Sequence, residues 1–166
     1  VAAYEELTVA TYALDIPSGD WVRLSNSPRP LNCRTYDIYA FDPLSRETRQ
    51  ISPQRDADEF NPSWSPNGKN VAYDVLYPDG NFEVYLTDLK TGVTAPLVGA
   101  GPGSNDAVWS PNGKWLAFDR DGSIYIVPSE GGEATSVKTD AVSADWAPNG
   151  KRVVFQQPSD GSIRTV

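Results

Sequence analysis

The sequence predicts an all-β fold made of repeated four-stranded antiparallel units, and three observations support this. The segment SWSPNGKNVAYDV at 63–75 returns as VWSPNGKWLAFDR and as DWAPNGKRVVFQQ, which indicates one copied supersecondary unit. The 166 residues include 14 prolines and 13 glycines, a composition that favours strands and tight turns over helices. No segment reaches the roughly 20 consecutive apolar residues of a membrane helix, so we expect no membrane insertion.

The turn glycines Gly68, Gly113 and Gly150 recur at intervals of roughly 40 residues, which is the length of a propeller blade. Proline presets a negative φ in each turn and glycine accepts a positive φ, so each turn is predicted to close a hairpin. The second strands are expected at 71–73, 116–118 and 153–155. The third strands are expected at 83–88, 123–128 and 162–166, and fourth strands end near 97 and 137.

A degenerate first copy precedes these three. IPSGDWVRL at 16–24 aligns with the turn and second strand, YDIYAFD at 36–42 with the third, and ETRQIS at 47–52 with the fourth. The sequence therefore predicts a single domain, 1–166, that forms a β-propeller of four four-stranded antiparallel blades. The blades cover approximately 9–52, 56–98, 103–138 and 141–166, the last with the strand 1–8.

The last copy ends after its third strand, and the N-terminal segment 1–8 is predicted to supply the missing fourth one. An unfinished sheet leaves unpaired backbone groups, which pairing with this segment would remove. A donor from the same chain closes a ring, whereas a donor from a neighbour builds a dimer or an open filament. A third alternative is that the chain belongs to a larger propeller of six to eight blades. The predicted strand-exchange edge comprises Val1, Tyr4, Leu7, Ile163 and Val166.

Charge and composition exclude several classes of function. With 22 acidic and 14 basic residues the net charge is −8, which opposes nucleic-acid binding. The chain contains no histidine, so His-based triads and HExxH zinc sites are excluded. Cys33 is the only cysteine and is expected to be a free thiol or, less simply, an intermolecular bridge. We expect no cofactor and no metal.

A start at Val1 without any methionine is expected of a processed product, such as one with its secretion signal removed, or of a trimmed chain.

Four carboxylates are candidate ligands of a channel site. Asp58, Glu59, Asp106 and Asp145 lie on or just before the predicted first strands, which line the channel of a propeller. Converging there, they could bind a cation or act as the acid and base of a glycosidase. The alternative is that they are solvated rim residues. DRDGS at 119–123 is interpreted as a tight turn rather than a calcium loop, and GAGPG at 99–103 as a linker between blades.

Two sets of aromatic residues occupy equivalent places in the copies. Trp64, Trp109 and Trp146 end the first strands and are expected to pack between adjacent blades rather than to stack on a ligand. The tyrosines of the third strands are expected to do the same; they are Tyr39, Tyr85 and Tyr125.

Together, the tryptophan-led SPNGK turn, the apolar pair ending in an aromatic residue, and the later Ile-Tyr with an aspartate resemble the repeat of TolB-type β-propellers over 36–166. The peptidases with this repeat carry a separate α/β-hydrolase domain with a Ser-His-Asp triad, and this sequence has neither that domain nor any histidine. The resemblance thus implies an extracytoplasmic, non-catalytic scaffold that binds a protein partner, either another protein or a copy of itself in a homo-oligomer or filament. The alternative is a carbohydrate-active enzyme or a glycan- or cation-binding module that uses the channel carboxylates.

Overall fold

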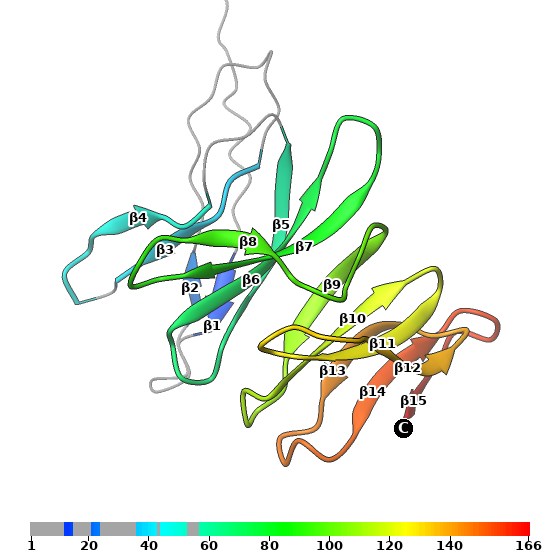
Figure 1. The fold of residues 1–166 in the computed structure, drawn as a ribbon. Coiled ribbons are helices and arrows are strands. Elements are labelled where there is room, and N and C mark those ends of the chain that lie inside the picture. The colour runs from blue at the N-terminus through cyan, green and yellow to red at the C-terminus, as the bar shows by residue number, and fades with distance from the viewer. Residues whose placement is uncertain (1–11, 15–20, 24–35, 43, 53–56) are drawn as a thin grey trace, which may run out of the picture.

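The computed structural model describes residues 12–14, 21–23, 36–42, 44–52 and 57–166, and all of its regular elements in these ranges are strands (Figure 1). Successive strands pair antiparallel and form separate sheets that follow one another along the chain. Within the described ranges there is no helix of the length and apolar character that crossing a bilayer requires. The chain is an all-β propeller, as the sequence predicts.

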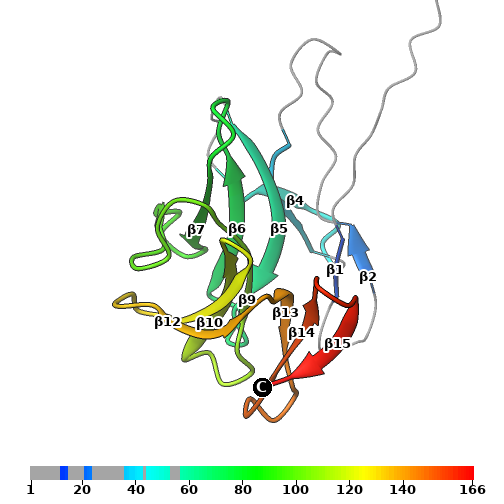
Figure 2. The ribbon, with the colours of Figure 1, turned by 90° about the vertical axis from the view of Figure 1, so that its right-hand side faces the viewer.

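Two complete four-stranded sheets form the middle of the molecule, each in the order of its strands. The second blade comprises β5 (Asp58–Trp64), β6 (Asn70–Leu76), β7 (Phe82–Asp88) and β8 (Thr94–Pro96). The third blade comprises β9 (Ser104–Trp109), β10 (Trp115–Arg120), β11 (Ser123–Pro128) and β12 (Thr135–Thr139). The first strands β5, β9 and β13 contact one another in turn, near the centre of Figure 2.

The two end blades are less complete in the described residues. The last sheet holds β13 (Val142–Trp146), β14 (Val153–Gln157) and β15 (Ser162–Thr165). The first blade is described as two hairpins, β1 (Tyr12–Leu14) with β2 (Trp21–Arg23) and β3 (Tyr39–Phe41) with β4 (Thr48–Gln50). The predicted donor strand 1–8, with Val1, Tyr4 and Leu7, lies outside the described residues, as does Cys33.

Apolar side chains pack in three clusters, and each cluster joins two consecutive blades. Ile38 and Ile51 of the first blade pack with Val71, Tyr73 and Val75 of the second. The cluster that joins the second blade to the third contains Ala72, Val84, Leu116, Phe118 and Val127. The cluster that joins the third blade to the last contains Ala117, Ile124, Ala144, Val153 and Phe155. Burial of apolar area between blades is therefore what holds successive units together.

The SPNGK turns are fixed by side-chain hydrogen bonds to the backbone. Ser110 Oγ accepts a hydrogen bond from Trp115 N (2.9 Å) and donates one to Asn112 Oδ1 (2.9 Å). Asn112 Oδ1 also accepts one from Lys114 N at 2.9 Å. Ser65, Asn67, Lys69 and Asn70 repeat these contacts in the second blade. The last turn has Ala147 in place of serine and keeps only the contact from Lys151 N to Asn149 Oδ1 (3.0 Å).

We therefore expect Ser110→Ala to lower the free energy of unfolding by about 1 kcal/mol, because it removes the buried hydroxyl that accepts from the amide of Trp115 and closes the turn. Urea denaturation of the variant and the parent chain measures this. Ala147→Ser is the matched control: it adds the missing hydroxyl, and we expect no loss of stability. Equal stability of Ser110→Ala and the parent would contradict the assigned role.

Candidate functional site

Each first strand contains a bulge that brings a polar residue to the inner face of its blade. The residue three positions before the tryptophan that ends each of β5, β9 and β13 has a positive φ: 49° at Asn61, 54° at Asp106 and 56° at Ser143. The pairing register of the first strand with the second shifts at the same places. Asn, Asp and Ser tolerate or satisfy this backbone better than β-branched residues do, which explains the residue types.

An aspartate from the preceding blade holds each of the last two bulges. Asp74 lies on β6, the strand that pairs with β5. Its Oδ2 accepts hydrogen bonds from the backbone N of Asp106 (2.9 Å) and from Asn61 Nδ2 (2.9 Å). Asp119 of β10 accepts one at Oδ2 from the backbone N of Ser143 (2.7 Å). Each carboxylate therefore links the second strand of one blade to the first strand of the next. We call Asp74 and Asp119 the latch aspartates.

The latch aspartates lie close to a third carboxylate. Asn61 Nδ2 donates to Asp106 Oδ1 at 2.5 Å as well as to Asp74, so one amide bridges two acids. Burial raises the pKa of Asp74 to about 7, and the nearby Asp106 charge adds to this, against the lowering effect of the amide donors. Burial likewise raises the pKa of Asp119 to about 6 and raises that of Asp106. Carboxyls of this kind exchange protons near neutral pH.

The four predicted channel carboxylates lie on first strands, but they do not share one set of contacts. Asp106 is half-buried and belongs to the cluster with Asn61 and Asp74. Asp145 is exposed and accepts a hydrogen bond from the backbone N of its neighbour Trp146 (2.7 Å). Asp58 accepts one from the backbone N of Tyr36 (3.1 Å), and Glu59 is buried at the start of β5. A convergent site made of these four residues therefore stays a prediction.

The chemistry of the cluster is limited by its burial. Asp74 has no exposed surface, so its carboxyl cannot touch a dissolved substrate without rearrangement. Among the described residues, Asp74 Oδ1 and Asp119 Oδ1 are buried without a hydrogen-bond partner, so little offsets the cost of burying a charge on either carboxyl. Among the residues that the structure describes, no three His, Cys, Asp or Glu side chains are grouped as ligands for a metal ion. The arrangement joins blades and is able to bind protons.

Sequence reasoning missed the latch aspartates, although the repeat carries their signal. Tyr73-Asp74 and Phe118-Asp119 occupy the same place in successive copies, where the last copy has Phe155-Gln156. An aspartate that follows a buried aromatic residue in two successive copies indicates a polar contact made by the second strand. The position of the backbone N–H groups that donate to it in the next copy follows only from the three-dimensional arrangement.

The expected packing of the tryptophans is confirmed. Trp146 Nε1 donates a hydrogen bond to Val108 O of the preceding blade at 3.2 Å. Trp109 packs against the cluster that joins the second and third blades, and Trp64 against the cluster before it. Tyr85 and Tyr125 pack in these same two clusters, where their rings stack with Tyr73 and Phe118. These aromatic residues contribute to the contacts between consecutive blades.

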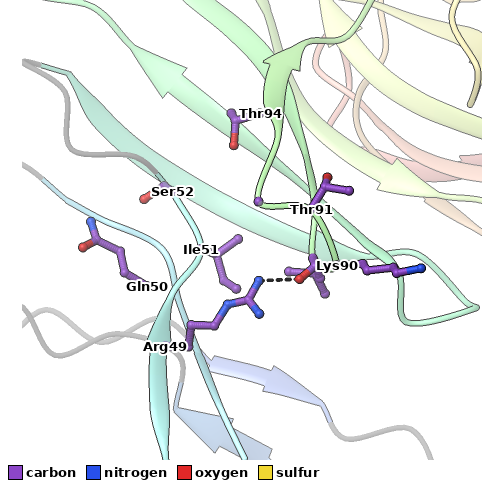
Figure 3. A pocket seen from close by; sticks show the side chains of 9 residues that line it. Arg49, Gln50, Ile51, Ser52, Lys90, Thr91 and Thr94 are labelled. Atoms are coloured by element: carbon purple, nitrogen blue, oxygen red, sulfur yellow. Dashed lines mark hydrogen bonds between the residues drawn. The ribbon is translucent and has the colours of Figure 1, made fainter.

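A polar pocket of about 340 Å³ lies between the first and second blades, at the β7–β8 turn (Figure 3). Arg49 is fixed there because its Nη2 donates to the backbone O of Leu89 at 2.6 Å, as the dashed line in Figure 3 shows. Lys90 and Thr91 come from the turn itself, and Ile51 adds an apolar wall. Among the described residues that line this pocket there is no carboxylate.

The outer edge of β15 is a second candidate binding surface, because among the described strands only β14 pairs with β15. Val153 and Val166 exchange both backbone hydrogen bonds, at 2.8 and 2.9 Å. Antiparallel pairs alternate, so Arg164 also faces β14 whereas the N–H groups of Ile163 and Thr165 point away from it. Within the described residues β15 has one neighbour, β14, and the side chain of Ile163 is 77% exposed.

Comparisons with known proteins agree with this architecture. A protein of Agrobacterium fabrum described as uncharacterized is 36% identical over 101 residues, which cover 55% of this chain and 33% of that protein. The uncharacterized peptidase YuxL of Bacillus subtilis is 31% identical over 106 residues, 56% of this chain and 16% of its own length. The crystal structure of TolB from Acinetobacter baumannii superposes with a TM-score of 0.63 at 18% identity, over 94% of this chain and 48% of that one. The chain thus spans half or less of each of these relatives.

The family profile of the TolB β-propeller domain matches residues 34–166, which is most of the sequence and includes every tryptophan-led turn. The structural likeness to TolB supports the same fold independently of sequence identity. The chain belongs to the TolB β-propeller domain family.

Proposed function

We propose that this chain is a non-catalytic interaction scaffold that binds a protein partner, and that β15 is one of its points of assembly. The observation that carries the proposal is the outer edge of β15, which presents two outward N–H groups beside the exposed Ile163. An added strand would complete the last blade to the four strands of the blades before it. The donor is the N-terminal segment 1–8, of the same chain or of a second copy.

Several features support a scaffold over an enzyme. The sequence has no histidine, and Asp74, whose pKa is raised to about 7, is fully buried and joins two blades. Relatives of this family include a peptidase, but only 16% of that protein is matched by this chain. A carbohydrate-active site built on Asp106 and Asp145 is the alternative. Hydrolysis of a glycan by the parent chain, lost in Asp106→Asn and Asp145→Asn, would favour that alternative over ours.

The family membership also underlies a proposed extracytoplasmic location, on the cell surface, in the periplasm or secreted. The test is fractionation of cells that produce the complete protein from its own gene. We expect the chain outside the cytoplasm, and recovery in the cytoplasm alone would contradict the proposal.

Sedimentation of the full chain over a range of concentrations tests the strand addition. We expect Ile163→Pro to prevent assembly, because proline removes one outward N–H while the inward pairs with β14 remain. Ile163→Thr is the matched control, since it removes the apolar side chain and keeps the N–H group. If the donor is a neighbour, the parent and Ile163→Thr sediment as oligomers and Ile163→Pro as a monomer.

If the donor is the same chain, the parent and both variants are monomers. The free energy of unfolding of Ile163→Pro is then about 1–2 kcal/mol lower than that of Ile163→Thr, as urea denaturation measures. Identical assembly and identical stability of Ile163→Pro and Ile163→Thr would overturn the strand-addition proposal.

A further inference from the structure

The turns that join first and second strands form one continuous surface at one end of the molecule. These turns, 65–70, 110–115 and 147–152, follow one another along the lower left edge of Figure 1. A Cβ atom at Gly113 would lie 3.7 Å from Pro66 Cδ, and one at Gly150 would lie 3.7 Å from Pro111 Cδ. Each turn therefore packs against the next, so side chains on neighbouring turns are presented together.

This surface is basic, in contrast to the chain as a whole. The three turns carry Lys69, Lys114, Lys151 and Arg152, all exposed, and no acidic residue. The first turn continues into the pocket of Figure 3, because the backbone N of Leu89 donates to Lys69 O at 2.8 Å. We define the basic stripe as these four cations with the two of the pocket, which are Arg49 and Lys90.

The cations of the stripe are available for a partner. The one ion pair between described residues joins Arg164 to Asp160, away from these turns. The carboxylate of Asp88, next to the pocket, accepts hydrogen bonds from the backbone N of Lys90 (3.0 Å) and of Thr91 (2.7 Å) and so faces its own turn. The outer turns that join third and fourth strands carry the acidic residues Asp42, Glu47, Glu130 and Glu133, which limit the stripe on its outer side. Asp145 is exposed on β13, two residues before the turn that carries Lys151 and Arg152.

The stripe also offers apolar contacts. Trp115 follows Lys114 directly and is 38% exposed, and Ile51 lines the pocket at the other end. Tryptophan is enriched among the interface residues that contribute most of a binding energy, and Trp115 adjoins one cation of the stripe, Lys114. A ligand that matches the stripe thus carries several negative charges in a row together with an apolar side chain.

We propose that the basic stripe binds an extended acidic peptide segment of a partner protein, with an aromatic or aliphatic residue seated near Trp115. This inference rests on the proposed scaffold function and specifies the chemistry of one partner. The row of cations, repeated once per blade, fits carboxylates along an extended chain better than one small anion. Nucleic acid fits less well, because six cations on a molecule of net charge −8 oppose a dense row of phosphates.

Fluorescence anisotropy with a fluorescein-labelled peptide of glutamates around one central tryptophan tests the proposal on the full chain. We expect binding that weakens as salt is raised, and that weakens about tenfold in Lys69→Gln/Lys114→Gln. The matched control is Lys138→Gln/Arg164→Gln, which changes the net charge equally but lies off the stripe. We expect its affinity to stay within about twofold of the parent.

Three outcomes overturn the proposal: no binding of the peptide, an equal loss in the stripe and control variants, or displacement of the peptide by duplex DNA at lower concentration than by unlabelled peptide. Circular dichroism of each variant separates lost binding from lost fold. Failure here is distinct from failure of strand addition, because Ile163→Pro leaves the stripe intact. Peptide binding by Ile163→Pro with parental affinity would support the stripe as an independent surface.

Discussion

Gly99→Ala is expected to lower the free energy of unfolding by about 2–4 kcal/mol, although Gly99 lies in an exposed loop. Gly99 has φ 98°, and a Cβ atom there would lie 1.8 Å from the backbone O of Gly132 in the third blade. That approach is part of a seam in which the N–H of Gly132 donates to Val98 O at 3.2 Å. Because the clashing atom belongs to the backbone, the whole β11–β12 turn has to move to accommodate the methyl group.

Gly80→Ala is the matched control for this prediction. Gly80 has φ 87°, and a Cβ atom at that place meets nothing within 4 Å. Its substitution carries only the cost of a positive φ in an L-residue, about 1–2 kcal/mol. Urea unfolding gives the free energy of unfolding of both variants. The loss in Gly99→Ala beyond that in Gly80→Ala measures the cost of the clash with the third blade. Equal losses in Gly80→Ala and Gly99→Ala would show that the seam between the second and third blades is not closely packed.

Stability is expected to fall as pH rises from about 4 to about 8, because of the latch aspartates. The pKa of Asp74 is about 7 in the folded chain, above its usual value of 3.8, so the folded state binds the proton more tightly than the unfolded state. The resulting stabilisation is full below the unfolded pKa and is lost as pH rises through the folded pKa. Asp119, with a pKa of about 6, acts in the same direction. Each unit of difference corresponds to about 1.4 kcal/mol, so the shift of the buried Asp74 alone predicts a loss of about 4 kcal/mol. Asp119 is less completely buried than Asp74, and solvent screening makes its contribution smaller.

Asp74→Asn separates this effect from other titrations. Asparagine keeps an oxygen that accepts the hydrogen bond from Asp106 N and removes the titrating proton, so the slope of stability against pH should become shallower. The carboxyls with a lowered pKa, such as Asp42 and Asp88, change stability only at more acidic pH. Urea unfolding at closely spaced pH values gives the slope. An identical slope in the parent and in Asp74→Asn would contradict the raised pKa of Asp74.

Much of the fold could be predicted from the repeat because turn chemistry and apolar alternation are local properties. The third strand predicted at 123–128 coincides with β11, and the tryptophans end their first strands as expected. The DRDGS segment forms the turn between β10 and β11, and 99–103 connects the second and third blades. These features depend on proline, glycine and the period of the strands, which the sequence shows directly.

The site was harder to predict because it depends on contacts between copies. The sequence predicts Asp106 of β9 as a channel carboxylate. Its partners Asn61 and Asp74 lie on β5 and β6 of the preceding blade, which the sequence does not indicate. The basic stripe was missed for a similar reason: its lysines lie far apart in sequence and only the packing of successive turns brings them together. Net charge, which is −8, gave no indication of such a local reversal.

Amide hydrogen exchange of β15, followed by NMR on the full chain, tests the scaffold account most directly. Arg164 and Val166 face β14 and serve as internal references that are protected in any case. If a strand is added, the amides of Ile163 and Thr165 exchange slowly as well, at all concentrations for a donor in the same chain or increasingly with concentration for a neighbour. Exchange of these two amides at the rate of an open chain under every condition would contradict the account.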